Sequence, residues 1–484
     1  MIDQEDSAET CSNESRINLR EISEELLRFE VAERLWSLTI RGIPFWERVR
    51  FQVHQQMLQA SGIYEQAHDR FRFSIQSLIR FAAESTRNTI AGNPETVGPS
   101  EYVFFGSPRR KLGENGNWWD IYCDPIIESL DGDSTYCEFP YRGRHLRPAQ
   151  TQHIRYFDRY VITRYFAQRI APKRAALPPA AMRMLQELGN GLSGLCGQEI
   201  VIDNLVQNSL VEREWMLPVY ERFLGKARPS VVCLVCSYGL DTLVEACQRL
   251  DIKTAELQHG STGPYHFGYH YPAESFKKAH FPDYMLLFGA FWGTLAEFPV
   301  PRERIRVVGF PYLESEIAKR RDHSRKRQIV FISQGTIGKR LSRMAAEFAR
   351  DKRRTHSIVY KLHPGEFDRW HDEYPWLQDE RIEVVANQRS LYEILAESEL
   401  QVGVYSTAIF EGCAFGLGTV LIDLPGIELM QTWAEATGIP VISSVNELVE
   451  RTVSPPAAGA DSEALFASHA LENMRKTLEE LATT

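Results

Sequence analysis

The chain has 484 residues, which is too long for one ordinary hydrophobic core, so about two or three domains are expected. Hydrophobic residues make up 43% of the chain and charged residues 25%, as in globular proteins. The formal net charge of −9 excludes a global basic field, so no nucleic-acid partner is expected.

Residues 1–17 are polar and acidic, which predicts a disordered tail and no secretory signal. No uninterrupted apolar run reaches the roughly 18 residues of a membrane-spanning helix. We therefore expect a cytoplasmic protein, with peripheral contact at the inner face of the cell membrane left open.

Helical periodicity begins at Leu19 and extends to about Ala60, with a break at Gly42 and Pro44. A second helical stretch is predicted near 71–83, followed by a polar loop. These segments predict a helical layer that precedes the first sheet.

Short apolar runs separated by helical segments then predict a parallel sheet that is buried on both faces. Its predicted strands are 102–106, 135–139, 231–236, 254–258 and 284–289, with helices at 178–192 and 198–223. Cys233 and Cys236 form a lone CxxC inside one of these runs, which favours buried strand cysteines over a metal site.

A second series alternates strand and helix about once per 25 residues, the pattern of a doubly wound sheet. Its predicted strands are 328–333, 357–362, 381–385, 400–404, 419–423 and 440–443, and its helices 339–351, 390–397, 407–415, 428–437 and 446–451. The predicted fold class is α/β, with two Rossmann-like doubly wound domains that face a cleft. Their predicted ranges are 18–315, including the helical extension, and 328–455, followed by a C-terminal helix at 461–484. The basic segment 319–327 between them is either a solvated linker or a contact for anionic lipid or a polyanionic acceptor.

Ligands of open α/β sheets bind beyond the carboxyl ends of the strands, so residues at those positions are the candidates. His363 and Pro364 end a strand, and the imidazole can donate to phosphate oxygens; Lys361 adds positive charge nearby. The alternative for His363 is a turn or capping role.

Two further strand ends predict an anion site. Ser406 and Thr407 open a helix whose free N–H groups suit a phosphate, and Glu411, one turn later, can accept hydrogen bonds from ribose hydroxyls. A plain helix cap is the alternative. The turn Gln334, Gly335 and Thr336 resembles an anion nest, although many βα turns look alike.

His259 ends a strand of the first series, where an acceptor hydroxyl would need a base. His266 and His270 follow in segment 260–272, but their spacing suits no common zinc site, so no metal is expected. That segment predicts either a mobile acceptor loop or an ordinary surface loop.

The segment 106–125 also follows a strand and mixes aromatic and charged side chains, as carbohydrate sites do; the alternative is a loop anchored by two buried tryptophans. Asp120 is a second candidate base. The candidate acceptor-binding residues are Arg109, Arg110, Trp118 and Trp119.

Taken together, His259-Gly260, His363-Pro364, and Ser406-Thr407 with Glu411 resemble motifs of the GT-B glycosyltransferases of bacterial surface and capsular polysaccharide synthesis. The resemblance covers about 230–450 and extends to CDP-glycerol glycerophosphotransferases, capsule Kdo transferases and polysialyltransferases. It implies a GT-B-like fold.

The resemblance further implies an inverting, metal-independent transferase that uses a CMP- or CDP-linked donor and no cofactor. His363, Ser406 and Thr407 would hold the donor phosphate, Glu411 the ribose, and His259 would be the general base. The acceptor would be a surface glycan or a lipid-linked molecule. One departure is Gln258, where the glycerophosphotransferases carry a tryptophan before His-Gly.

Two alternatives remain at this stage. A UDP-sugar 2-epimerase has two similar halves, but it usually carries a Gly-Gly pair where this chain reads YSTAIF at 405–410, which favours transfer. A non-catalytic sugar- or nucleotide-binding scaffold is the second alternative, since fold alone does not determine function.

Overall fold

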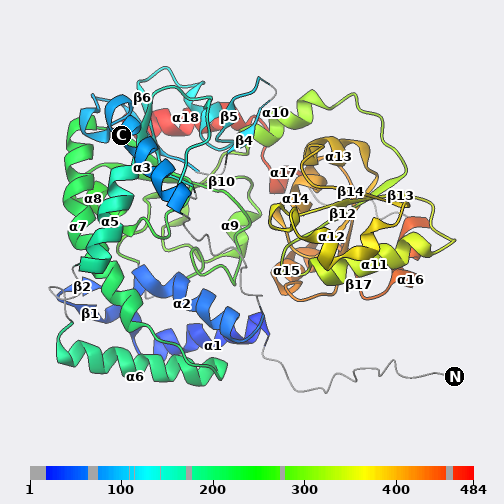
Figure 1. Ribbon diagram of the computed structural model, residues 1–484, viewed down its shortest axis with the longest axis horizontal. Coiled ribbons are helices and arrows are strands. Elements are labelled where there is room, and N and C mark those ends of the chain that lie inside the picture. Colours follow the sequence, from blue (N-terminus) through cyan, green and yellow to red (C-terminus); the bar gives the residue numbers. More distant parts are fainter. Residues whose placement is uncertain are drawn as a thin grey trace.

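The structure is a computed structural model that describes residues 18–63, 75–107, 110–113, 115–141, 143–170, 177–272, 278–453 and 462–483. Two α/β halves lie side by side, each built around one main parallel sheet (Figure 1). This confirms the predicted class of two Rossmann-like domains with a helical extension. The predicted disordered tail at 1–17 lies outside the described residues.

The first sheet has the strand order β11-β10-β9-β8-β3-β6-β7, and all its neighbouring strands are parallel. Its strands are β3 (Tyr102–Phe105), β6 (Ser134–Glu138), β7 (Ile154–Tyr156), β8 (Val231–Leu234), β9 (Lys253–Leu257), β10 (Tyr284–Leu287) and β11 (Ile305–Val307). The chain runs outward from β3 through β6 to β7, then returns to β8 on the other side of β3. The topological switch point therefore lies between β3 and β8.

The second sheet has the order β14-β13-β12-β15-β16-β17 and is also parallel throughout. Its strands are β12 (Gln328–Ile332), β13 (Ser357–Lys361), β14 (Ile382–Val385), β15 (Leu400–Gly403), β16 (Gly418–Ile422) and β17 (Val441–Ile442). The five residues of β12 are all buried, as the apolar run predicts. The switch point here lies between β12 and β15.

Helices cover both sheets. Those of the first half are α1 (Leu19–Ala32), α2 (Trp46–Ala60), α3 (Ile75–Ala91), α4 (Asp124–Ile127), α5 (Asp158–Ile170), α6 (Pro179–Cys196), α7 (Asp203–Ala227), α8 (Asp241–Arg249), α9 (Trp292–Leu295) and α10 (Pro311–Lys319). Those that follow are α11 (Gly338–Arg350), α12 (Trp370–Glu373), α13 (Leu391–Glu397), α14 (Thr407–Ala414), α15 (Glu428–Thr437), α16 (Val445–Val453), α17 (Ser462–Leu465) and α18 (Ala470–Thr483). Two small hairpins pair β1 (Thr39–Ile40) with β2 (Ile43–Pro44), and β4 (Lys111–Leu112) with β5 (Trp118–Trp119).

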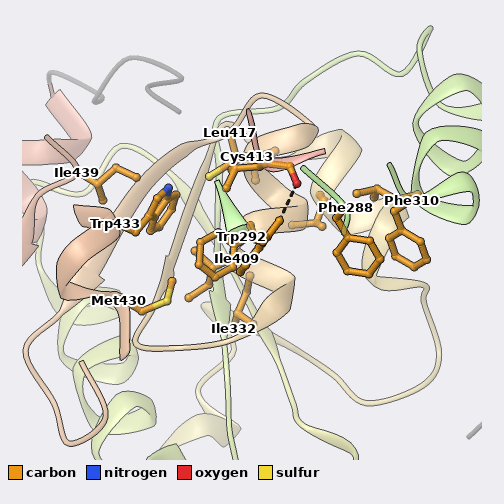
Figure 2. Packing of buried hydrophobic residues seen from close by; sticks show 14 of the residues in the cluster. Phe288, Trp292, Phe310, Ile332, Ile409, Cys413, Leu417, Met430, Trp433 and Ile439 are labelled. Atoms are coloured by element: carbon orange, nitrogen blue, oxygen red, sulfur yellow. Dashed lines mark hydrogen bonds between the residues drawn. The ribbon is translucent and has the colours of Figure 1, made fainter. Parts of the chain in front are cut away.

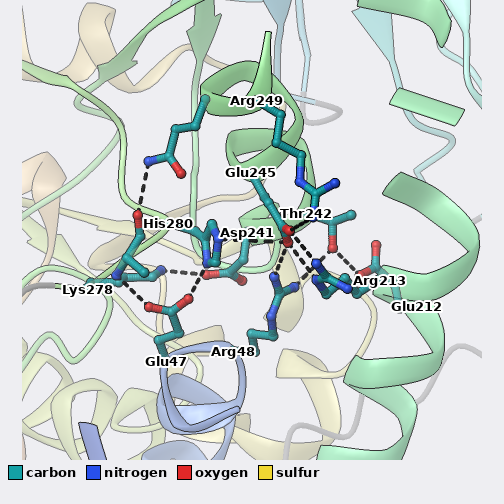
Figure 3. Close-up of polar contacts among 12 residues, drawn as sticks. Glu47, Arg48, Glu212, Arg213, Asp241, Thr242, Glu245, Arg249, Lys278 and His280 are labelled. Carbon is teal, nitrogen blue, oxygen red and sulfur yellow. Dashed lines mark hydrogen bonds and ion pairs between the residues drawn. The ribbon is translucent and has the colours of Figure 1, made fainter. Parts of the chain in front are cut away.

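Helices α1, α2 and α6 form the N-terminal layer, which lies below the first sheet in Figure 1. Buried polar contacts fasten α2 to α8 and to the residues that precede β10 (Figure 3). Arg48 Nη2 lies 2.8 Å from Glu245 Oε2, and Glu47 accepts from the backbone N–H of Ala279 at 2.7 Å. Both side chains of the Arg48–Glu245 pair are almost fully buried. The helical extension is thus an integral part of the first half.

The C-terminal helix α18 returns to the first half, where it packs on α4 and α10. Glu314 of α10 accepts from the backbone N–H groups of His469 and Ala470 at 2.8 and 2.9 Å, and so caps this helix. At its other end Lys253 Nζ donates to the Leu481 carbonyl at 2.9 Å. The chain therefore crosses between the two halves twice.

An apolar core joins the two halves (Figure 2). Trp292 of α9 packs edge-on against Phe410 of α14, with ring centroids 4.7 Å apart, and Phe410 contacts Trp433 of α15 at 4.6 Å. Trp292 Nε1 also donates to the Leu465 carbonyl at 2.7 Å. These contacts hold α9 of the first half against α14 and α15 of the second half.

The basic segment 319–327 is largely engaged with its own surroundings. Lys319 Nζ and Arg320 Nη1 bind Glu316 at 2.7 and 2.8 Å, Arg325 donates to the Gly416 carbonyl at 2.6 Å, and Lys326 pairs with Glu397 at 2.8 Å. These contacts agree with a linker role, and contact with membrane lipid stays a prediction. No helix among the described residues is both long enough and apolar enough to span a membrane.

Candidate functional site

The switch point of the second sheet brings together candidate residues that were predicted from separate motifs of the sequence. The hydroxyl groups of Thr336, after β12, and Tyr405, after β15, form a hydrogen bond across it. A Cβ atom on Gly335 would lie 3.8 Å from His363 Nδ1, so the glycine turn and the His-Pro turn are adjacent. The side-chain oxygen of Gln334 is buried there without a hydrogen-bond partner among the described residues. Such an atom is suited to a donor supplied by a ligand.

His363 is exposed and held in one orientation by its own turn. Its Nδ1 accepts from the backbone N–H of Gly365 at 3.1 Å, which leaves the ring proton on Nε2. Its backbone N–H donates to Glu366 Oε2 at 2.7 Å. Pro364 begins the 3₁₀ turn Pro364–Glu366. The predicted capping role is therefore real.

Glu366, which sequence analysis did not identify, anchors this turn. Its Oε1 accepts from Ser333 Oγ and from the Tyr374 hydroxyl, each at 3.0 Å. Ser333 directly follows β12, so the carboxylate joins the ends of β12 and β13. Burial raises the pKa of Glu366, and its hydrogen-bond donors oppose that rise.

Helix α14 begins at the predicted position. Ser406 is its N-cap and accepts from the Ala408 N–H at 3.3 Å. Glu411 lies one turn further along, and burial raises its pKa, while Lys111 and the Tyr392 hydroxyl act in the opposite direction. Lys111 belongs to β4 of the first half, so the predicted ribose site receives a positive charge from the other half.

Two lysines meet near this position. Lys361 donates to the Ala386 carbonyl, and its pKa falls to about 8, first through burial and then through Lys111. The ammonium group of Lys111 lies over the rings of Tyr392 and Tyr312, 4.7 and 5.4 Å from their centroids. Lys111 lies in the charged segment 106–125, where the sequence alone did not single it out.

His259, at the end of β9, lies between two tyrosine hydroxyls. Tyr238 OH is 3.2 Å from Nε2 and Tyr269 OH is 3.2 Å from Nδ1. Tyr269 donates its own proton to the buried carboxyl group of Glu256. The Tyr122 hydroxyl donates to the His259 carbonyl at 2.8 Å. His259 is half-buried, and a tyrosine hydroxyl at each ring nitrogen fixes the orientation of its imidazole.

The two halves meet directly at the predicted motifs. A Cβ atom on Gly260 would lie 3.7 Å from Thr407 Oγ1. The turn that carries His259 therefore faces the N-terminus of α14. Donor-side and acceptor-side candidates from opposite halves therefore lie next to each other.

Comparisons with known proteins find structural likeness only. No family model matches the chain, and no curated protein matches it. Among solved structures, it is similar to a UDP-GlcNAc 2-epimerase from Methanocaldococcus jannaschii (12% identity, 79% of this chain, 99% of that one, TM-score 0.45). It is also similar to the wall teichoic acid polymerase TagF (10%, 85%, 99%, 0.42) and to a UDP-N-acetylglucosamine 2-epimerase from Rickettsia bellii (11%, 79%, 95%, 0.46).

Asp120 is buried and hydrogen-bonded, whereas a general base would have to reach the acceptor. It is fully buried, and its oxygens accept from the backbone N–H groups of Ser107 and Tyr122 at 2.7 and 2.9 Å and from the Tyr136 hydroxyl at 2.7 Å. Burial raises its pKa. Asp120 thus positions Tyr122, which in turn holds the His259 carbonyl.

The acceptor-binding candidates divide into three groups. The side chain of Arg110 is fully buried and paired with Glu138, so it cannot contact an acceptor, and that prediction is corrected. Trp118 and Trp119 are half-buried in β5, and Trp119 lines a cavity. Arg109 lies outside the described residues.

The segment 260–272 packs against the first half. It is therefore neither the mobile acceptor loop nor the ordinary surface loop that the sequence predicted. Phe267, Tyr269 and Tyr271 are buried. Arg50 of α2 donates to the carbonyl groups of Phe267 and His270, each at 2.7 Å. The N-terminal layer therefore holds the segment that follows His259. Among the described residues, no group of three His, Cys, Asp or Glu side chains is arranged to hold a metal ion.

Three buried histidines, two in this segment and one in α2, predict an acid sensitivity. Burial lowers the pKa of His54 to about 3, and the pKa values of His266 and His270 to about 4. They are neutral in the fold, whereas an unfolded histidine titrates near pH 6.5. As pH falls below about 6.5, the unfolded state binds protons first, so stability falls by about 1.4 kcal/mol per pH unit for each group until the folded-state pKa is reached.

Urea unfolding at pH 7.5 and 5.5 checks this prediction. His54→Gln should reduce the difference in unfolding free energy between the two pH values, because one titrating group is removed. Identical pH dependence in the wild type and the variant would contradict it.

Proposed function

We propose that the protein is a glycosyltransferase that moves a sugar from a CMP- or CDP-linked donor to a surface glycan or lipid-linked acceptor. The observation that carries the proposal is the position of His259-Gly260 opposite the start of α14, with Gly260 close to Thr407 Oγ1. One half offers a base to an acceptor hydroxyl, and the other offers an anion site to a leaving nucleotide.

The donor site uses the second switch point. The Nε2–H of His363 and the N-terminus of α14, with Ser406 and Thr407, bind the phosphate whose negative charge grows as the nucleotide leaves. Glu411 binds the ribose. The turn of Gln334, Gly335 and Thr336 completes the site, with Pro364 fixing its backbone and Lys361 and Lys111 adding positive charge.

The acceptor reaction uses His259. Its imidazole takes the proton of the acceptor hydroxyl, whose oxygen attacks the anomeric carbon as the bond to the donor phosphate breaks. Direct displacement inverts that carbon, and no metal ion or cofactor takes part. Asp120 acts through Tyr122 to position His259. The reaction takes place in the cytoplasm, at the inner face of the membrane if the acceptor is lipid-linked.

A thermal-shift screen with CMP, CDP, UDP, GDP and ADP, with EDTA and no added metal, tests the donor site. A nucleotide that binds only the folded state raises apparent stability by about 2.7 kcal/mol at 100 times its Kd. We expect a shift with CMP or CDP that is lost in His363→Ala and kept in His371→Ala, since His371 is an exposed histidine of the same half.

A shift with UDP alone would favour UDP-sugar chemistry, including 2-epimerisation, over a cytidine donor. No shift with any nucleotide would contradict the proposal and favour a binding scaffold. A shift that needs Mg²⁺ would contradict metal independence.

A further inference from the structure

A cavity of about 700 Å³ lies beside the proposed donor site, where several elements of both halves meet. Its walls come from the β4–β5 hairpin, α4, α10, α13 and the start of α18. The volume falls within the range of sites for small ligands. Tyr312 forms part of its wall and also lies beneath Lys111, so the cavity adjoins the cleft.

Two aromatic side chains line this cavity. Trp119 comes from β5 and Tyr312 from α10, and each is half-buried. The indole N–H of Trp119 points toward Asn115 Oδ1, 3.4 Å away. The polar edge of the ring is thus engaged within the hairpin. Aromatic rings of this kind pack against the C–H faces of sugar rings, while hydroxyl and amide groups around them bind sugar hydroxyls.

The two cations that line the cavity are paired with a carboxylate, and the other two carboxylates accept hydrogen bonds from uncharged groups. Lys319 and Arg320 both bind Glu316, at 2.7 and 2.8 Å. Glu128 accepts from Gln150 at 2.6 Å, and Glu393 accepts from the backbone N–H of Ser390 at 3.1 Å.

The described lining residues contain three carboxylates and two cations, so negative charge is in excess. A phosphate or a carboxylated sugar would find no unpaired cation among them, and its charge would be opposed by the excess carboxylate. Hydroxyl groups of an uncharged sugar would meet Ser129, Ser315 and Asn115.

We propose that this cavity binds uncharged sugar units of the acceptor. Its role as an acceptor subsite rests on the proposed transferase function, whereas the binding itself does not. Because α13 belongs to the second half and the hairpin to the first, a bound glycan contacts both halves. The sugar units in the cavity would be those of the acceptor that lie away from the reacting hydroxyl at His259.

The test applies the full chain to an array of neutral and sialylated oligosaccharides, followed by calorimetric titration of the neutral oligosaccharide that gives the strongest signal. We expect the wild type to bind neutral glycans. We expect Trp119→Ala to bind the chosen oligosaccharide with an affinity lowered by about tenfold or more. Trp215→Ala, an exposed tryptophan of α7, is the matched control and should bind normally.

Leu112→Glu is a second variant, because Leu112 lines the cavity and is 59% exposed, so the fold should tolerate the change. The added carboxylate should also weaken neutral-glycan binding. Unchanged affinity in both variants would overturn the proposal, as would binding to sialylated glycans alone or to no glycan.

The nucleotide screen on Trp119→Ala separates this proposal from the proposed function. A retained cytidine-nucleotide shift together with lost glycan binding supports the cavity as a sugar site. Loss of the nucleotide shift in this variant would identify the cavity as part of the donor site and overturn the proposal. A wild-type chain that binds glycan but no nucleotide would contradict the transferase and leave the sugar site supported.

Discussion

Replacing His259 by alanine is expected to lower kcat by about 10²- to 10⁴-fold, the usual contribution of a positioned general base. The nucleotide-induced thermal shift should persist, because His363, Ser406, Thr407 and Glu411 lie on the other half. The measurement is a steady-state rate with the donor identified by the nucleotide screen. His323→Ala, an exposed histidine in the linker, should keep the wild-type rate.

Tyr269→Phe refines this prediction. Tyr269 donates to Glu256 and its oxygen lies 3.2 Å from His259 Nδ1, so it can accept the Nδ1 proton and leave Nε2, which lies 3.2 Å from the Tyr238 hydroxyl, unprotonated as a base requires. Removing the hydroxyl should lower kcat by less than His259→Ala does and should move the pH profile of kcat. A full kcat in His259→Ala, with activity abolished in a folded Asp120→Asn, would instead place the base in the segment 106–125.

Much of the fold could be predicted because buried parallel strands have a distinctive composition. All four residues of β8 are buried, and the apolar run at 231–236 indicates this directly. The edge strand β11 was not predicted, because two of its three residues, Arg306 and Val307, are exposed. A short strand with one half-buried residue carries little periodic signal.

The candidate site was only partly predictable, for a related reason. Motifs at strand ends show which residues reach the cleft, but their partners arrive through strand pairing. The partners of Arg110 and Asp120, Glu138 and Tyr136, come from β6, which pairs with β3. The charged segment 106–125 therefore resembled a ligand site in sequence, although these two side chains stabilise the turn itself.

The tyrosines around His259 illustrate the same limit. Tyr238 and Tyr269 are 21 and 10 residues away along the chain. Only the adjacent positions of β8 and β9 and the packing of the segment 260–272 bring their hydroxyls to the imidazole. The role of the N-terminal layer could not be predicted from the sequence either, because Arg50 donates hydrogen bonds to backbone carbonyl groups more than 200 residues away along the chain.

Arg50→Met is expected to lower the free energy of unfolding by about 3–5 kcal/mol, because Glu30 would keep a buried charge without its partner. The side chains of Arg50 and Glu30 are 1% and 0% exposed, and Arg50 Nη2 lies 3.0 Å from Glu30 Oε2. Urea unfolding measures the change. The matched control is Arg28→Met, which breaks an exposed ion pair with Glu25 on α1 and should cost less than about 1 kcal/mol.

The double variant Glu30→Leu/Arg50→Met separates stability from positioning. Removing both charges should restore much of the lost stability, since an apolar pair can replace a buried ion pair. It cannot restore the hydrogen bonds to the Phe267 and His270 carbonyls, which hold the segment that carries Tyr269. We therefore expect the double variant to fold nearly as stably as the wild type and still to show a reduced kcat. A normal kcat in that variant would mean that the N-terminal layer supports the fold alone, and that apolar contacts such as the stacking of His54 on Phe267 suffice to hold the segment beside His259.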